Sequence, residues 1–212
     1  MKKIIALIFT MIFSAVLLCG CNEDEKGNSV AYEDLEYGST MRQILNGNID
    51  LYFDGRFLTD EEMNAVSDYY YAVETDDLEL FKTTQPEYYV EFLEQQSGNS
   101  LESYLNDEKK DVVDATGENF KYTSIEVTSC GDSSEDQGIT DIIDMLNGVY
   151  EDYGASSKFE DTLKDAKFIM ADLTVTVGDE EYLYTDKLIY IFNCGDNIST
   201  TFFYFLKGEK EP

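Results

Sequence analysis

The period of the hydrophobic pattern changes partway along this 212-residue chain, and the change constrains the fold more than any other feature. From about residue 60 to about residue 117, apolar side chains recur every three or four residues, as on a helix with one buried face. From about residue 121 they alternate, as on a strand with one buried face. Helices followed by strands predict an α+β domain, with the helices packed on a curved antiparallel sheet.

Caps and breakers predict four helices in the first half of the domain. A Ser, Thr or Asp at an N-cap accepts a hydrogen bond from an otherwise unpaired backbone N–H, and a Glu three residues later completes a capping box. Proline suits the first turn of a helix, and glycine suits the position just after its last turn. The signals are, in order, Thr59 with Glu62 for a helix over 60–74, then Asp77, Pro86, and Ser100 with Gly117.

The second half of the chain predicts strands. Residues 169–177 alternate without a break and form the clearest strand. Residues 121–128 alternate less cleanly, because Tyr122 lies on the face opposite to Ile125 and Val127. We expect the face with Ile125 and Val127 to be buried, since its side chains are β-branched.

The remaining elements complete the sheet. Asp54-Gly55 lies between two apolar stretches in residues 48–58, which predicts a hairpin. A helix is expected over 140–153, inserted between strands. The last two strands, 182–192 and 198–206, carry apolar residues on both faces. We therefore expect this pair in the middle of the sheet, covered on both sides.

This order of elements resembles the cystatin-like, cone-shaped fold of the nuclear-transport-factor-2-like superfamily. The resemblance rests on residues 68–77 (DYYYAVETDD), on PEYY at 86–89 and on the strand–turn–strand–turn–strand run over 166–207. It covers roughly residues 59–207 and implies a cone that is often open at one end. Many relatives end in a strand that contains Trp, whereas this chain has no Trp. The chain also resembles uncharacterised extracytoplasmic lipoproteins of Gram-positive bacteria.

The first 21 residues predict a lipoprotein signal peptide. Two lysines precede an uncharged apolar run over 4–18, which is too short for an ordinary membrane-spanning helix of roughly 20 residues. The tetrapeptide that ends at Cys21 resembles a lipobox, in which the last cysteine is lipidated. Cys19 fits that role poorly, because bulky Leu18 would stand next to the cut. An ordinary secretory signal or a buried apolar element is the alternative.

We therefore expect three regions: a signal peptide over 1–20, a lipidated Cys21 with a polar tether over 21–31, and one α+β domain over 32–212. The expected location is the extracytoplasmic side of the cell membrane, and the expected membrane partner is the bilayer that holds the acyl anchor. Without residues 1–20 the chain carries 13 basic and 44 acidic side chains, a formal charge of −31. This charge disfavours nucleic acid as a partner.

The residue types offer little catalytic chemistry. There is no histidine, so the superfamily's common His–Asp pair cannot be carried over to this chain. No phosphate loop or nucleophile elbow is present. We predict no catalytic residue, no cofactor and no metal site. Calcium is the best-supported alternative, since two loops are acidic, but solvated loops are expected. These loops carry Asp132, Glu135 and Asp136, and Asp179, Glu180 and Glu181.

Cys130 and Cys194 remain after export and could form a disulfide in an oxidising compartment. One strand is expected between them, however. Two strand spacings add up to about 10 Å, which exceeds the reach of a disulfide. Two buried thiols are the default. A tyrosine-lined cavity is a further possibility.

The leading functional hypothesis is a non-catalytic module that binds a small ligand or a protein partner. The alternatives are a structural accessory without a ligand, and a hydrolase or isomerase that uses carboxylates only.

Overall fold

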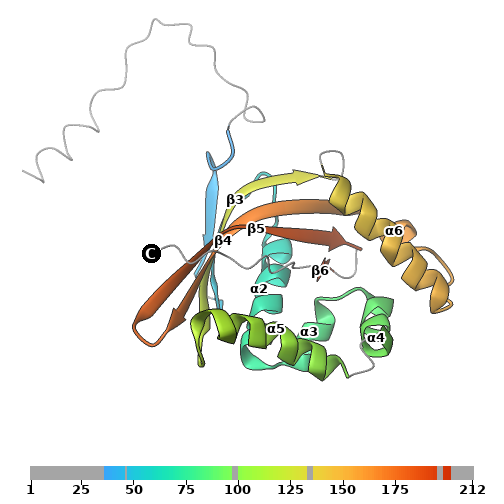
Figure 1. The fold of residues 1–212 in the computed structure, drawn as a ribbon. Helices are drawn as coiled ribbons and strands as arrows, with labels where there is room; N and C mark the ends of the chain where they lie inside the picture. The colour runs from blue at the N-terminus through green and yellow to red at the C-terminus, as the bar shows by residue number, and fades with distance from the viewer. Residues whose placement is uncertain (1–35, 46, 97–99, 133–135, 195–197, 202–212) are drawn as a thin grey trace, which may run out of the picture. The chain divides into compact units, whose positions relative to one another are not determined.

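A six-stranded sheet curls into half a barrel, and helices accompany it (Figure 1). The structure is a computed structural model that describes residues 36–45, 47–96, 100–132, 136–194 and 198–201. These residues belong to one compact unit that begins at Glu36. The predicted signal peptide, Cys21 and the tether lie outside the described residues, as does the end of the predicted last strand.

The chain order is two strands, four helices, one strand, one helix with a short 3-10 turn, and three strands. The strands are β1 (Met41–Ile44), β2 (Asp50–Asp54), β3 (Lys121–Asp132), β4 (Asp165–Val177), β5 (Glu180–Asn193) and β6 (Ile198–Thr201). The helices are α2 (Asp60–Thr75), α3 (Leu78–Thr83), α4 (Glu87–Gln96), α5 (Leu101–Thr116), α6 (Gln137–Asp152) and the 3-10 turn η3 (Phe159–Thr162). The α+β class is as expected, and α6 lies between β3 and β4 in the chain.

The sheet is mixed rather than wholly antiparallel. Its strands follow the chain order β1-β2-β3-β4-β5-β6, and neighbours are antiparallel except for β2 and β3, which run parallel. Parallel neighbours need a long crossover, and the four helices between β2 and β3 supply it. The expected antiparallel meander is therefore correct for β3 to β6 and wrong at β2.

The predicted central position of the last two strands is also wrong, because β6 lies at the edge of the described sheet and β5 lies next to it. The apolar residues on both faces of β5 have another cause. Ile189 and Ile191 are buried on one face, while Tyr190 and Phe192 are buried on the other. Helix α2 contacts β5, and the ring of Phe192 packs edge-on against Phe159 of η3. Helices and turns cover the strand without its being central.

The predicted hairpin at Asp54-Gly55 is a third correction. Strand β2 pairs with the earlier β1, so the hairpin turn lies before β2 and not after it. Asp54 instead ends β2, and its side chain is fully buried in a polar network described below. Asp54 is therefore a buried residue of a polar network and not an exposed residue of a hairpin turn.

The predicted caps are present. The Thr59 side chain accepts a hydrogen bond from the Glu62 backbone, and Glu62 accepts one from the Thr59 backbone, which completes the capping box. Asp77 caps α3, and Ser100 caps α5. Gly117 follows α5 with a φ of 120°, a value that favours glycine.

Strand β3 shows why its alternation was imperfect in the sequence. Its register with β4 shifts between Tyr122 and Ser124, so one extra residue enters the strand there. Tyr122, Ile125 and Val127 are all buried as a result. The expectation for Ile125 and Val127 is confirmed, and the irregularity adds Tyr122 to the core.

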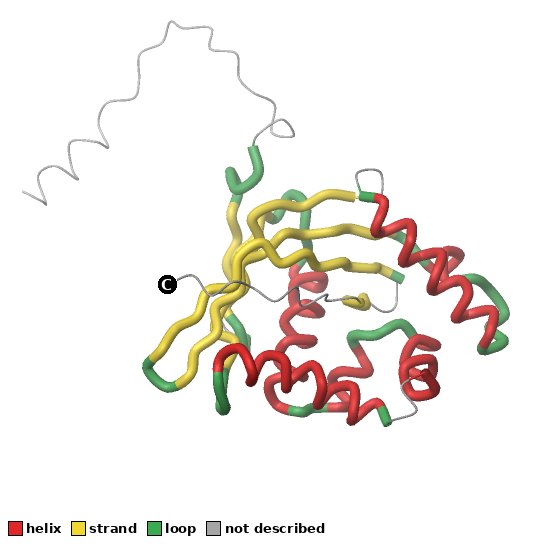
Figure 2. The backbone as a smooth tube through the Cα atoms, in the orientation of Figure 1, coloured by secondary structure: helices red, strands yellow, loops and turns green. Residues whose placement is uncertain are grey.

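The core lies between the sheet and the helices. Ile169, Ala171, Leu173 and Val175 of β4 are at most 1% exposed, as the unbroken alternation predicted. Helix α2 contacts β3, β5 and β6. Figure 2 shows α2 to α5 on the concave side of the sheet, with α6 beyond the end of β3. Within the described part of the chain, no helix has the length and apolarity needed to span a bilayer.

Candidate functional site

A cleft of about 790 Å³ lies between α4, the segment that follows α6, and the ends of β5 and β6. Helices α4 and α6 contact each other at the right of Figure 1. The volume falls within the range of about 300–1,000 Å³ that is common for small-molecule sites. Polar and apolar side chains both line it, so it is neither a packing defect of the core nor a purely hydrophobic groove.

Helix α4 supplies the acidic wall of the cleft. Glu87, Glu91 and Glu94 line the cleft and are exposed to solvent. Their spacing of four and three residues places them on one face of the helix. Within the described ranges, no basic side chain forms an ion pair with any of the three. The one basic side chain that lines the cleft there, Lys82, is paired with Glu79 at 2.9 Å.

The opposite wall follows α6. Helix α6 gives way to a turn at Gly154, whose φ of 73° favours glycine, and the chain then presents Ala155, Ser156 and Ser157 to the cleft. The Tyr153 hydroxyl donates to the backbone carbonyl of Glu91 at 3.3 Å and so joins this wall to α4. The wall is thus rich in small side chains and hydroxyl groups.

A pair of tyrosines lies where the two walls meet. Tyr88 of α4 and Tyr150 of α6 both line the cleft, and their rings are edge-to-face with centroids 4.8 Å apart. Burial, together with negative charge from groups such as Glu87, raises the pKa of Tyr150 to about 12. Its hydroxyl therefore stays protonated at neutral pH and acts as a hydrogen-bonding group rather than as an anion.

Ser199 of β6 also lines the cleft, and its side chain is unusual in being both buried and polar. It is only 2% exposed, and its buried Oγ has no hydrogen-bond partner in the part of the chain that the structure describes. Leaving a buried hydroxyl unsatisfied costs on the order of 1–3 kcal/mol, so such groups are rare and call for an explanation. A polar ligand atom in the cleft would supply the missing partner.

Cys194 also lines the cleft, at the end of β5. Burial raises the pKa of its thiol, and the hydrogen bond with Thr162 opposes that shift without cancelling it. The thiol is therefore protonated at neutral pH and is a poor nucleophile.

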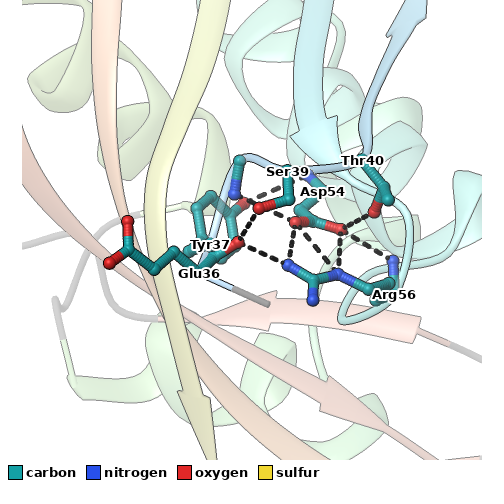
Figure 3. A network of polar contacts seen from close by, with 7 residues as sticks. Glu36, Tyr37, Ser39, Thr40, Asp54 and Arg56 are labelled. Atoms are coloured by element: carbon teal, nitrogen blue, oxygen red, sulfur yellow. Dashed lines mark hydrogen bonds and ion pairs between the residues drawn. The ribbon is translucent and has the colours of Figure 1, made fainter. Parts of the chain in front are cut away.

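A second polar region surrounds Asp54, at the end of β2 (Figure 3). Arg56 donates to its carboxylate from Nη2 at 2.7 Å, from Nε at 3.1 Å and from its backbone N–H at 3.1 Å. The backbone N–H of Gly38 and the hydroxyl of Thr40 also donate to the Asp54 carboxylate, and Arg56 donates to the carbonyl of Glu36 at 2.7 Å. The side chains of Asp54 and Arg56 are 0% and 5% exposed.

The role of this network is structural. The Arg56 guanidinium holds the pKa of Asp54 well below its usual range, so the carboxylate is charged at any physiological pH. Its oxygens are already occupied by donors from residues 36–40 and from Arg56. The network therefore fastens the start of the described chain to β2 and leaves no carboxylate oxygen directed at a ligand.

A third polar cluster lies around Glu108 of α5. The Tyr69 hydroxyl donates to Glu108 Oε2 at 3.4 Å, and burial raises the pKa of the Glu108 carboxyl. Tyr70 and Tyr122 pack nearby with ring centroids 4.8 Å apart. Glu108 does not line the cleft. Its hydroxyl partner comes from a core residue, so the cluster belongs to the packing of α2 against α5.

The two predicted cysteines are not brought together. Both are half-buried. Cys130 pairs across β3 and β4 with Ile169, and Ile169 pairs with Ile189 of β5, five residues before Cys194. At about 3.3 Å per residue and two strand spacings of about 4.8 Å, the cysteines are separated by roughly 15–20 Å. That distance exceeds the reach of a disulfide.

No group of three potential metal ligands gathers among the described residues of the two acidic loops. Asp132 ends β3, and Asp136 caps α6 by accepting a hydrogen bond from Gly138, while Glu135 lies outside the described residues. Asp179, Glu180 and Glu181 are exposed at the turn between β4 and β5.

The residues of the cleft that were not predicted as site residues from the sequence are Glu87, Glu91, Glu94 and Ser199. The four- and three-residue spacing of the glutamates was a readable signal for one acidic helix face, but nothing in the sequence indicated which element lies opposite that face. The burial of Ser199 depends on the packing of β6 and has no local signal. No protein-family model matches the chain, and no curated protein or solved structure is significantly similar to it.

Proposed function

We propose that this protein is an extracytoplasmic lipoprotein, anchored to the cell membrane through Cys21, whose α+β domain binds a small molecule without catalysis. The anchor is supported by the basic, apolar and small-residue pattern of the first 21 residues. The binding role rests on one observation above the others, the unpartnered and buried hydroxyl of Ser199 in the wall of the 790 Å³ cleft.

We also propose that the domain is a variant of the cystatin-like cone. The curled sheet, the helices on its concave side and the insertion of α6 between β3 and β4 support this architecture. The parallel pairing of β2 with β3 departs from it, because it adds two strands ahead of the helices. The cleft would then lie toward the α6 end of the cone.

The absence of catalysis is supported by the chemistry of the cleft. The chain has no histidine, so the commonest general base is missing. The thiol of Cys194 is held in its neutral form, because burial raises its pKa. A binding site needs shape and placed polar groups, and the cleft offers both.

A cleft-blocking variant tests the binding role. Ser156 is exposed at the rim of the cleft, so Ser156→Trp should fill the entrance without disturbing the core. Asn106→Trp on the exposed side of α5 is the matched control. Thermal-shift screening of a small-molecule panel should give ligands that stabilise the wild type and Asn106→Trp but not Ser156→Trp. A panel whose ligands stabilise all three equally, or none of them, would contradict the proposal.

A labelling experiment tests the anchor. A clickable fatty-acid analogue should mark the protein in growing bacteria, and Cys21→Ala should abolish the label. Labelling that survives Cys21→Ala and disappears in Cys19→Ala would show that the other cysteine is modified.

A further inference from the structure

We propose that the ligand of the α4 cleft is a small aliphatic polyamine, a molecule with two or more ammonium groups separated by short methylene chains. This inference rests on the proposed binding function of the cleft. The observation behind it is that three carboxylates without ion-pair partners in the described ranges share a cleft with an aromatic pair and a buried, unpartnered hydroxyl.

The spacing of the carboxylates fits such a ligand. Glu87 and Glu91 are four residues apart on α4, and Glu91 and Glu94 are three apart. At a rise of about 1.5 Å per residue they are separated by about 6 Å and about 4.5 Å along the helix axis. An extended aminobutyl or aminopropyl segment places its two nitrogens about one helical turn of 5.4 Å apart. Successive ammonium groups can therefore meet successive carboxylates.

The other walls suit an ammonium group and a methylene chain. Tyr88 and Tyr150 present aromatic surface, which attracts cations and also covers methylene groups. An ammonium group has three N–H donors and no acceptor. The unpartnered oxygen of Ser199 can accept one of them, and the hydroxyls of Ser156 and Ser157 are at the rim.

Other ligand classes fit less well. The three carboxylates repel anions, since Lys82 already pairs with Glu79. Calcium needs six to eight oxygens at about 2.3–2.6 Å, whereas carboxylates one helical turn apart are spread along α4. The described part of the chain holds no group of three or more His, Cys, Asp or Glu residues placed to bind a metal ion. A neutral ligand would leave the charge of the α4 wall unused.

The test is calorimetric titration of the full mature chain with spermidine at an ionic strength of about 0.1 M, where the Debye length is about 10 Å. The cleft variant combines Glu87→Gln, Glu91→Gln and Glu94→Gln. The matched control combines Glu118→Gln, Glu126→Gln and Glu181→Gln, which are exposed and lie outside the cleft. Both variants lose three negative charges, and circular dichroism checks that each is folded. Ser199→Ala and a tri-lysine peptide are further arms.

We expect saturable binding of spermidine that is at least tenfold weaker in the cleft variant, several-fold weaker in Ser199→Ala, and within twofold of wild type in the control. Equal weakening in both triple variants would reduce the effect to general surface charge and overturn the proposal. Tighter binding of tri-lysine would assign the cleft to a basic peptide and overturn it as well. If spermidine does not bind while another panel compound is blocked by Ser156→Trp, the polyamine assignment fails and the binding function stands. If nothing binds in the cleft, both fail.

Discussion

Asp54 and the three glutamates of α4 show two opposite ways of placing negative charge in one acidic protein. Asp54 is fully buried, and a guanidinium, a hydroxyl and backbone N–H groups satisfy its carboxylate. The α4 glutamates are exposed, lie along one wall of a cleft and have no ion-pair partner among the described residues. The Asp54 carboxylate makes its interactions within the fold, whereas the α4 carboxylates remain available to a ligand.

The largest expected effect is at the satisfied site. Arg56→Leu leaves the Asp54 carboxylate buried without its cation, which should lower the free energy of unfolding by about 3–5 kcal/mol. Arg42→Leu is the matched control, because Arg42 forms an exposed pair with Asp60 and should cost within about 1 kcal/mol. Urea denaturation measures both. A loss of stability in Arg56→Leu no larger than in Arg42→Leu would contradict the structural role of the Asp54 network.

Truncation of an apolar core residue should lower the free energy of unfolding by a similar amount. Leu173→Ala should cost about 2–5 kcal/mol, because Leu173 is 1% exposed and its truncation leaves a cavity. Thr174→Ser on the opposite face should cost within about 1 kcal/mol, since it keeps the hydroxyl that pairs with Ser124 at 2.9 Å. Equal losses in urea denaturation would show that both faces of β4 are equally buried.

The pH dependence separates Asp54 from Glu108. The folded-state pKa of Asp54 is lowered by Arg56, so its stabilising contribution is present above about pH 4 and is lost as the pH falls. The folded-state pKa of Glu108 is raised by burial, so its contribution is present below about pH 4 and is lost as the pH rises. Glu108→Gln should therefore gain stability relative to wild type between pH 4 and pH 8. A gain that is flat or reversed across this range would contradict the assignment.

The smallest stability effect is expected at the cleft. Glu91 forms no side-chain ion pair among the described residues, so Glu91→Gln should change the free energy of unfolding of the unliganded protein by no more than about 0.5 kcal/mol. Chemical denaturation without added polyamine measures this change. A loss above about 2 kcal/mol would mean that Glu91 stabilises the fold and is not available to bind a ligand.

The sequence predicted those elements whose signals are local. The capping box of Thr59 and Glu62, the caps Asp77 and Ser100, and the alternation of β4 depend on neighbours a few residues away, and the structure contains all of them. The parallel pairing of β2 with β3 depends on a crossover of four helices, which leaves no local pattern. The hairpin predicted at Asp54-Gly55 was wrong because the burial of the Asp54 side chain also depends on long-range packing. The neighbouring Arg56 is present in the sequence, but no local pattern indicates that the two side chains are buried together.

The cleft was predictable only in part. The spacing of Glu87, Glu91 and Glu94 by four and three residues was present in the sequence, but their position opposite residues 155–157 depends on how α4 packs against α6. The unpartnered state of Ser199 depends on burial at the edge strand. Long-range packing decides both features, and a single sequence does not report it.

Mapping bound spermidine by two-dimensional amide NMR tests the central claim most directly, because all acidic residues are observed in one titration. The account predicts saturable shift changes confined to α4, to residues 155–157 and to the neighbourhood of Ser199, with none at the Asp54 network. Small, non-saturating changes spread over the acidic surface, with no preference for α4, would contradict it.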